Sequence, residues 1–285
     1  MLLLAAGAAL PWGAADGEDL LVFRRGWVYH FSPEGERRLV QAEEGSRSPD
    51  GHHAVCLNGQ ALFVVEIRTG KAVWLTGPEA GARQPVWSPR GDQIAFVAVP
   101  GGGEPELRLV HPDGSEPRTL VAQGAEKRLT FFGLTWSPDG GSLIFHDLHH
   151  IYRVTLEGKT ATTTPVEQIT GEPYCVSSSD RFVQSPADPR VLAYTRAVGG
   201  PRLFERRFGE PKSGLFLYHA GSRTSKRLTP PDLLATSPAW SKDGAQIYFS
   251  GYYGRDRAAA PLRVYRIRPD GTGLAEVTRG ERPSP

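Results

Sequence analysis

The chain has 285 residues, of which 39% are hydrophobic and 22% are charged, a composition ordinary for a folded globular protein and unlike a disordered one. Its formal net charge is +2, and its 33 basic and 31 acidic side chains are interspersed. Nucleic-acid-binding proteins usually carry a basic block or stripe, so this pattern argues against nucleic acid as a partner.

The N-terminal segment, residues 1–15, carries no charged side chain and is apolar from Leu2 to Leu10. A membrane span takes roughly 20 apolar residues, so this run is too short, and no other apolar stretch approaches that length. Small residues before Asp16 are typical of a secretory signal, although the usual basic residues are missing. We predict a signal peptide over 1–15, one domain over 16–285, and a periplasmic or secreted location. Alternatively, this segment forms the innermost strand of the first repeat unit.

A unit centred on Trp-Ser-Pro-Asp-Gly recurs five times along the chain, as in PVWSPRGDQIAFV, LTWSPDGGSLIFH and PAWSKDGAQIYFS. By subtraction of residue numbers, its serines are 40, 49, 48 and 56 residues apart. Spacings near 40–50 residues are typical of four-stranded propeller blades rather than of helical solenoids. The marker serines are Ser48, Ser88, Ser137, Ser185 and Ser241.

Each unit contains four predicted strands, because alternating apolar and polar residues rich in β-branched and aromatic types indicate strands rather than helices. The first strand runs into the Ser-Pro-Asp-Gly turn, and the second alternates, as at 93–97 and 246–249. The third strands are predicted at 106–110, 151–154, 215–218 and 263–267. The fourth strands are predicted to end at Leu75-Thr76, Leu129-Thr130, Ile169-Thr170, Leu228-Thr229 and Val277-Thr278.

A sixth unit precedes the five marked ones, with strands predicted at 20–23, 27–31 and 37–40. One four-stranded sheet cannot bury both of its faces, and roughly 25 cal/mol is lost for each apolar Å² left in water. Stacking the sheets in a ring removes that cost and protects their edges. We predict an all-β fold, a six-bladed β-propeller of four-stranded antiparallel blades, with five or seven blades as alternatives.

This repeat resembles that of the TolB-like propeller family, which reads W-S-P-D-G, then an alternating strand, then a strand ending in D-x-x-G, then L-T. The resemblance extends from about Asp19 to Thr278. It implies the six-bladed fold. Propellers of this kind serve many roles, so the resemblance alone does not specify a function.

Binding residues are expected on the propeller face that carries the connections between second and third strands and between blades, because such loops vary in length. The segment 196–214 is rich in arginine, and the segment 251–261 combines tyrosine with arginine, two residue types enriched in interface hot spots. Alternatively, the first is a solvated excursion and the second packs its tyrosines on the next blade. The candidate binding residues in these segments are Arg206, Arg207, Tyr252, Tyr253 and Arg255.

A histidine-rich sequence, HDLHH, spans residues 146–150, and its His146 and His149 are further candidate binding residues. Imidazoles with a carboxylate can hold a transition metal. Alternate residues of a strand point to opposite faces, however, so these histidines are not expected to converge without ligands from other blades. We therefore expect a polar hairpin tip, and no metal or cofactor.

No nucleophile motif of the G-x-S-x-G type occurs, and the repeated serines are expected to shape turns, so we predict no catalytic residues. The two cysteines, Cys56 and Cys175, are predicted to be buried free thiols because they fall in non-adjacent blades. The leading functional hypothesis is a monomeric, non-enzymatic propeller that binds a protein or peptide on its loop-bearing face or in its channel. The alternatives are a metal-assisted lyase or hydrolase acting on a carbohydrate or acidic polymer, and a purely structural propeller.

Overall fold

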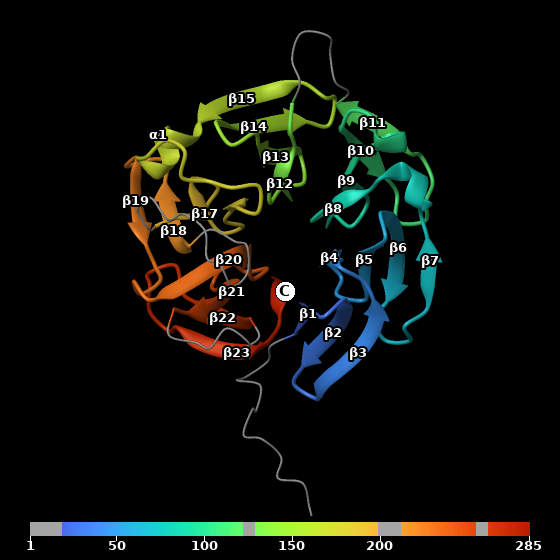
Figure 1. Cartoon of the computed structure of the whole chain (residues 1–285), viewed down its shortest axis with the longest axis horizontal. Coiled ribbons are helices and arrows are strands. Elements are labelled where there is room, and N and C mark those ends of the chain that lie inside the picture. The colour runs from blue at the N-terminus through green and yellow to red at the C-terminus, as the bar shows by residue number, and fades with distance from the viewer. Residues whose placement is uncertain (1–18, 122–128, 199–211, 255–261) are drawn as a thin grey trace, which may run out of the picture.

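The structure, a computed structural model, describes residues 19–121, 129–198, 212–254 and 262–285 (Figure 1). Six sheets, each of four antiparallel strands, are arranged in a ring, which confirms the predicted six-bladed all-β propeller. The one α-helix of the described residues, α1 (Val166–Thr170), follows the fourth strand of blade 4.

The strands of each blade run from the centre of the ring to its rim. Blades 1 to 3 contain β24 (Glu281–Ser284), β1 (Leu20–Arg24), β2 (Trp27–Ser32) and β3 (Gly35–Gln41); β4 (Glu44–Arg47), β5 (His53–Asn58), β6 (Ala61–Glu66) and β7 (Ala72–Trp74); and β8 (Arg83–Trp87), β9 (Ile94–Ala98), β10 (Glu106–Val110) and β11 (Arg118–Val121). Blades 4 to 6 contain β12 (Phe132–Trp136), β13 (Ser142–His146), β14 (His150–Thr155) and β15 (Thr160–Pro165); β16 (Phe182–Gln184), β17 (Val191–Ala197), β18 (Ser213–His219) and β19 (Thr224–Arg227); and β20 (Leu233–Trp240), β21 (Ile247–Tyr253), β22 (Arg263–Ile267) and β23 (Ala275–Arg279).

Blade 1 is completed by both ends of the described chain. Its innermost strand, β24, pairs antiparallel with β1, with Leu21 opposite Ser284 and Phe23 opposite Glu281. The position that the alternative interpretation gave to residues 1–15 is therefore held by β24. Pairing of β24 with β1 closes the ring.

The repeated tryptophans pack between blades rather than within them. Trp87, Trp136 and Trp240 are each only 8% exposed and lie in clusters shared with the preceding blade. The Nε1–H of Trp136 donates to the Val86 carbonyl (3.1 Å), and that of Trp240 donates to the Val183 carbonyl (2.9 Å). Each indole thus seals one blade against its neighbour, which explains why the marker unit carries a tryptophan.

The marker serines shape the turn between the first and second strands of each blade. In blade 4, the Ser137 hydroxyl donates to Asp139 (2.6 Å) and accepts a hydrogen bond from the Ser142 N–H (3.0 Å). The bond from Ser137 also lowers the pKa of the Asp139 carboxyl. We call the propeller side with these turns the turn face and the opposite side the loop face. The innermost strands run from the loop face to the turn face.

Two strand predictions are corrected by the structure. Ile169 and Thr170 were expected to end a fourth strand but lie in α1, because β15 already ends at Pro165. The Thr170 hydroxyl donates to the Val166 carbonyl (3.0 Å), as helical geometry allows. The predicted buried free thiols are found: Cys56 and Cys175 are both buried and unpaired with each other.

We expect Trp136→Ala to lower the free energy of unfolding by about 3–5 kcal/mol, because it empties a closely packed space between blades 3 and 4. Trp74→Ala provides the control, since Trp74 is 58% exposed on β7, and its cost should be about 1 kcal/mol or less. Urea unfolding followed by circular dichroism measures both. Equal losses for the two variants would contradict the proposed packing role.

Deleting residues 281–285 should expose the inner edge of β1 and its buried Leu21 and Phe23, and so lower the midpoint of thermal unfolding. Deleting only Pro285, which lies beyond β24, should change it little. A synthetic peptide of residues 279–285 should partly restore stability to the shortened protein. If the first deletion leaves the midpoint unchanged, β24 is not what closes the ring.

Candidate functional site in the central channel

The centre of the ring contains a cavity of about 1000 Å³. Residues of the innermost strands of all six blades and of the adjoining turns line it, including Trp87, Trp136 and Trp240. Sites for small molecules and extended ligands commonly have this size and lie where several elements converge. The channel is therefore the candidate site that the fold itself builds.

The inner wall of the channel is held together by hydrogen bonds between adjacent blades. The innermost strands have no further strand on their channel side, so their backbone groups need other partners. Side chains of neighbouring blades supply several of them. Such bonds join Arg47 N–H to Ser284 Oγ (2.8 Å), Trp87 N–H to Ser46 Oγ (3.2 Å), Leu134 N–H to Gln84 Oε1 (3.1 Å), Thr135 Oγ1–H to the Phe182 carbonyl (3.1 Å) and Arg282 N–H to Ser250 Oγ (2.7 Å).

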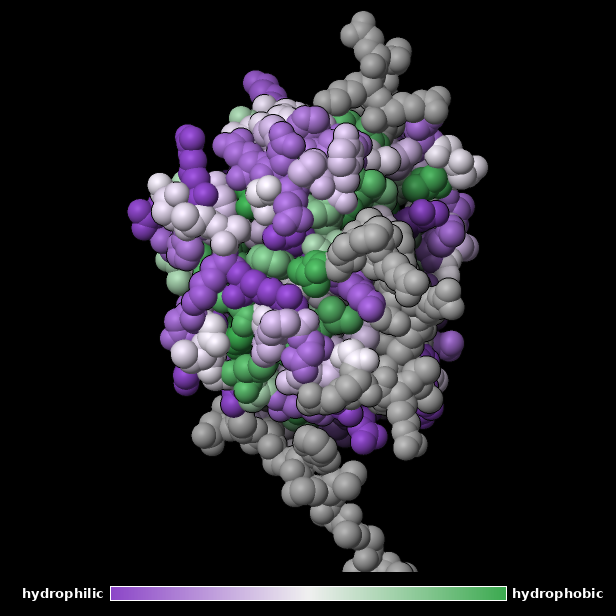
Figure 2. All heavy atoms as spheres, turned by 60° about the vertical axis from the view of Figure 1, so that its left-hand side comes forward, coloured by the Kyte–Doolittle hydropathy of each residue, from purple (hydrophilic) through white to green (hydrophobic). Residues whose placement is uncertain are grey.

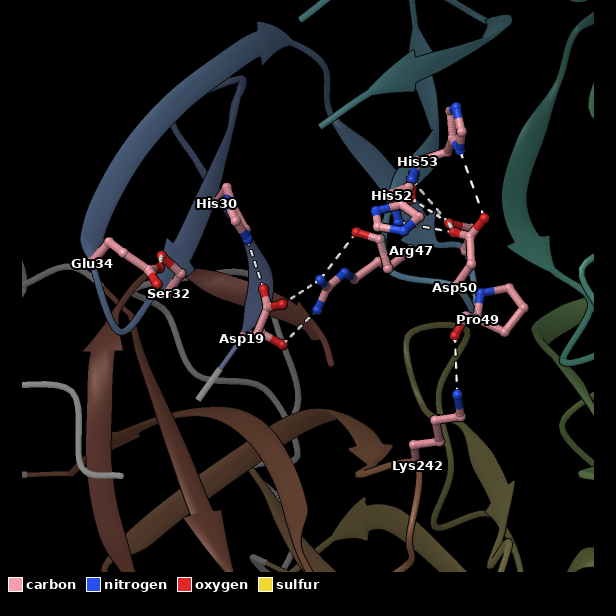
Figure 3. A network of polar contacts seen from close by, with 12 residues as sticks. Asp19, His30, Ser32, Glu34, Arg47, Pro49, Asp50, His52, His53 and Lys242 are labelled. Carbon is pink, nitrogen blue, oxygen red and sulfur yellow. Dashed lines mark hydrogen bonds and ion pairs between the residues drawn. The ribbon is translucent and has the colours of Figure 1, made fainter. Parts of the chain in front are cut away.

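The mouth of the channel, at the turn face, carries a polar network where the two ends of the chain meet (Figure 3). Asp19 accepts hydrogen bonds from His30 (2.6 Å) and from Arg47 (2.5 Å). Burial would raise the pKa of Asp19, but the bonds from Arg47 and His30 outweigh it and hold that pKa below its ordinary value. On the other side of blade 1, the Lys242 ammonium donates to the Pro49 carbonyl (3.2 Å), linking the turns of blades 6 and 2.

The loop-face end of the channel, which we call the channel floor, is formed by Glu44, Arg181 and Arg282. Glu44 begins β4 in blade 2, and Arg181 precedes β16 in blade 5. Blades 2 and 5 lie three positions apart in a ring of six, so they face each other across the axis. The Arg181 guanidinium nevertheless contacts the Glu44 carboxylate at 2.8 Å, with 23% and 14% of the two side chains exposed. This ion pair therefore spans the channel.

Arg282 adds a second guanidinium to the channel floor. Its Nη1 donates to the Glu43 carbonyl (2.6 Å), and its side chain lines the same cavity. Burial lowers the pKa of Arg181; Glu44 opposes this shift, and the positive charge of Arg282 adds to it. At this depth the cavity is lined by two cations and one anion.

A repeated backbone irregularity aims side chains at the channel floor. In blades 1, 3, 4 and 6 the innermost strand shifts register against its neighbour, which marks a β-bulge. A residue with positive φ lies at each shift: Arg282 (51°), Gln84 (51°), Gly133 (61°) and Ser237 (52°). At Gly133 only glycine fits, because a Cβ would meet the Asp180 carbonyl. Blades 2 and 5, which carry Glu44 and Arg181, pair without a shift.

The structure separates the two candidate histidines. His146 ends β13 with no exposed surface, and its ring nitrogens bond to the Asp180 carbonyl (2.9 Å) and the Leu148 N–H (3.3 Å). These partners fix the neutral ring with the proton on Nε2. His149 is exposed on the loop face and lies edge-on to Tyr174, with ring centroids 5.8 Å apart.

The candidate tyrosines both belong to β21 rather than to a loop. Tyr252 is 5% exposed, and Tyr253 is half-buried with its ring edge-on to Tyr265 at 6.2 Å. The three candidate arginines, Arg206, Arg207 and Arg255, lie outside the described residues. Within the described ranges, no group of three or more histidine, cysteine, aspartate or glutamate side chains is placed to hold a metal ion.

The residues of the channel floor were not singled out from the sequence, although a signal was present. Glu44 and Arg181 each precede the marker serine of their blade by four residues, and they carry opposite charges three units apart. Aligning the repeats on the marker serine and reading that one column would have brought the pair together. Arg282 follows no marker unit and could not have been found in this way.

Two solved structures share this fold. A structure from Agrobacterium tumefaciens described as a TolB aligns with a TM-score of 0.63 at 17% identity, covering 92% of this chain and 90% of that one. TolB from Acinetobacter baumannii aligns with a TM-score of 0.66 at 15% identity, covering 94% of this chain and 66% of that one. The chain thus has the TolB-like six-bladed propeller fold, as the repeat predicted.

Two curated proteins match by sequence. One is named uncharacterized peptidase YuxL, from Bacillus subtilis (strain 168), and is 26% identical over 243 residues, which are 80% of this chain and 32% of that protein. The other is the Tol-Pal system protein TolB of Gluconobacter oxydans (strain 621H), 46% identical over 61 residues. Those 61 residues are 21% of this chain and 12% of that TolB. The chain thus spans a third or less of each relative it matches, and no known family model matches it.

Hydrophobic residues on the outer side of the ring appear only in small patches among polar ones (Figure 2). Among the described residues, no helix has the length and apolarity needed to cross a membrane.

Stability should fall as the pH drops from about 6.5 to about 4, because burial lowers the pKa of His146 from 6.5 to about 4. In this window the unfolded chain binds the proton more tightly than the folded one, at about 1.4 kcal/mol per pKa unit, so the contribution is about 3 kcal/mol. His146→Phe should flatten this dependence, measured as unfolding free energies in urea at pH 7, 5.5 and 4.5.

The exposed His149 supplies the matched control for this measurement. His149→Phe should leave the pH dependence as it is in the unchanged protein. At pH 7, His146→Phe should itself cost about 1–3 kcal/mol, since two buried backbone groups lose their partner. An undiminished slope in His146→Phe would contradict the assignment of this titration to His146.

Proposed function

We propose that this propeller is a non-enzymatic binding module that holds an extended peptide segment of a protein partner in its central channel. The observation that supports this proposal is the cavity of about 1000 Å³, lined by all six innermost strands and open to the turns. The Tol-Pal name of one relative is in keeping with a role in protein interaction, although that match covers only 21% of this chain.

Recognition in this channel would rest on side chains rather than on strand addition. Several N–H and C=O groups along the inner wall are already bonded to the neighbouring blade, so they are not free to pair with an incoming strand. What the channel offers a ligand is the rims of Trp87, Trp136 and Trp240 and the charged groups of its mouth and floor. Partly exposed aromatic and arginine side chains of this kind are common at protein interfaces.

We also propose that the protein acts outside the cytoplasm and as a monomer. The apolar run of residues 1–15 supports export. The monomer is supported by the small size of the hydrophobic patches on the side of the ring seen in Figure 2. The alternative of a metal-assisted lyase or hydrolase has no supporting cluster of ligands among the described residues.

The proposal is tested by filling the channel. Ala239 is half-buried and lines the cavity, so Ala239→Trp should occupy space that a peptide needs. Peptides selected from a random twelve-residue display library against the unchanged protein should bind this variant at least about tenfold more weakly. Fluorescence anisotropy of the labelled peptides measures the affinity.

The matched control is Ala72→Trp, which adds the same ring to the exposed outermost strand β7. It should bind the selected peptides like the unchanged protein. If both variants bind equally well, or if selection yields no binding peptide, the channel is not a peptide site.

A further inference from the structure

We propose that Arg181 and Arg282 form a receptor for a carboxylate of the bound ligand, and that Glu44 occupies this receptor in the free protein. This inference rests on the proposed function, since the ligand is taken to be a peptide that enters the channel. It assigns the ligand an acidic group and gives the Glu44–Arg181 ion pair the role of an internal substitute for it.

The first support is the position of the pair. Glu44 and Arg181 stand four residues before Ser48 and Ser185, which at a strand rise of about 3.3 Å puts them about 13 Å below the turns. A segment that enters at the turn face meets this pair at the end of its path. Because the pair spans the axis, a ligand reaching that depth must displace one of its two partners.

The second support is the charge at the channel floor. Arg181 and Arg282 place two guanidinium groups on one cavity, whereas Glu44 provides a single carboxylate at this depth. The printed bond of Arg282 goes to the neutral Glu43 carbonyl and not to a carboxylate. Burial and the charge of Arg282 lower the pKa of Arg181 even though Glu44 is bound to it. An additional anion would therefore be stabilised here.

The third support is the chemistry of the groups. A guanidinium presents donors in a planar fork that matches a carboxylate, and charge-assisted bonds of this kind are stronger than neutral ones. A ligand carboxylate can take over the bonds that Glu44 makes without leaving Arg181 unpaired. Glu44 keeps the buried cation neutralised until that exchange, because an unpaired buried charge is costly.

The test uses citrate first, so that it does not depend on peptide binding. Citrate affinity is measured by calorimetry at constant ionic strength for the unchanged protein, Glu44→Gln and Arg181→Gln. Glu44→Gln should bind citrate about tenfold more tightly, because the competing carboxylate is gone, and Arg181→Gln should lose binding. Unchanged citrate affinity in Glu44→Gln would overturn the proposal.

Two exposed residues supply matched controls of the same charge change. Glu116→Gln and Arg68→Gln, whose side chains are 79% and 86% exposed, should leave citrate binding unaltered. The double variant Glu44→Gln/Arg181→Gln removes both charges, so it should fold if Arg181→Gln alone does not, and it should still fail to bind citrate. Citrate binding by the double variant equal to that of Glu44→Gln would also overturn the proposal.

Peptides then connect the receptor to the channel. A labelled (Gly-Glu)4 amide should bind more tightly than a (Gly-Gln)4 amide, and Glu44→Gln should increase that preference about tenfold. A (Gly-Gln)4 with a free C-terminal carboxylate shows whether a chain end serves as well as an acidic side chain. Peptide binding that Ala239→Trp blocks but that ignores peptide charge refutes the receptor and leaves the proposed function standing. Citrate binding as expected, with no peptide bound, refutes the proposed function and leaves the receptor standing.

Discussion

The structure depends on the pairing of β24 with β1, because no blade of this ring is stable by itself. Each sheet buries its faces against two neighbours, and blade 1 obtains its innermost strand only when the far end of the chain returns to it. Five blades are therefore continuous in sequence and one is assembled from both ends. The mouth of the channel is irregular at that place, and Asp19, Arg47 and His30 form their network where the other blades have a continuous turn.

The same packing decides which residues are available for function. The tryptophans and marker serines are used up by contacts between blades and by turns, so the repeated residues that are easiest to recognise are structural. The backbone of the inner wall is largely bonded across blade boundaries. What varies from blade to blade is the residue four positions before the marker serine, which can be glutamate, glutamine, glycine, arginine or serine. The ring positions these side chains around one axis without requiring any of them for its own closure.

The fold was predictable from the sequence because its determinants are local: the Ser-Pro-Asp-Gly turn, strand alternation and a blade-length spacing. Two elements were not. β24 lies in Glu281–Ser284, a segment without the marker, and only long-range pairing makes it a strand. Ile169-Thr170 follows the Leu-Thr pattern but lies in α1, since β15 ends before it. The channel floor was harder still, because Glu44 and Arg181 are 137 residues apart and meet only through the geometry of six blades.

The make-up of the channel floor is difficult to explain by stability alone. Replacing a buried ion pair by packed hydrophobic residues is often neutral or stabilising, so a ring selected only for stability would have no need of this pair. Arg282 adds a second cation beside Arg181, which raises the cost of burying either, and it does so from a left-handed backbone conformation (φ 51°) that non-glycine residues seldom adopt. Strained backbone and uncompensated charge both persist where the surrounding structure enforces them, and they are concentrated at functional sites. Blade 3 fills the equivalent bulge with Gln84, whose neutral amide satisfies the next blade at little electrostatic cost. The contrast between these two bulges in one ring argues that the charge at the channel floor serves recognition rather than closure.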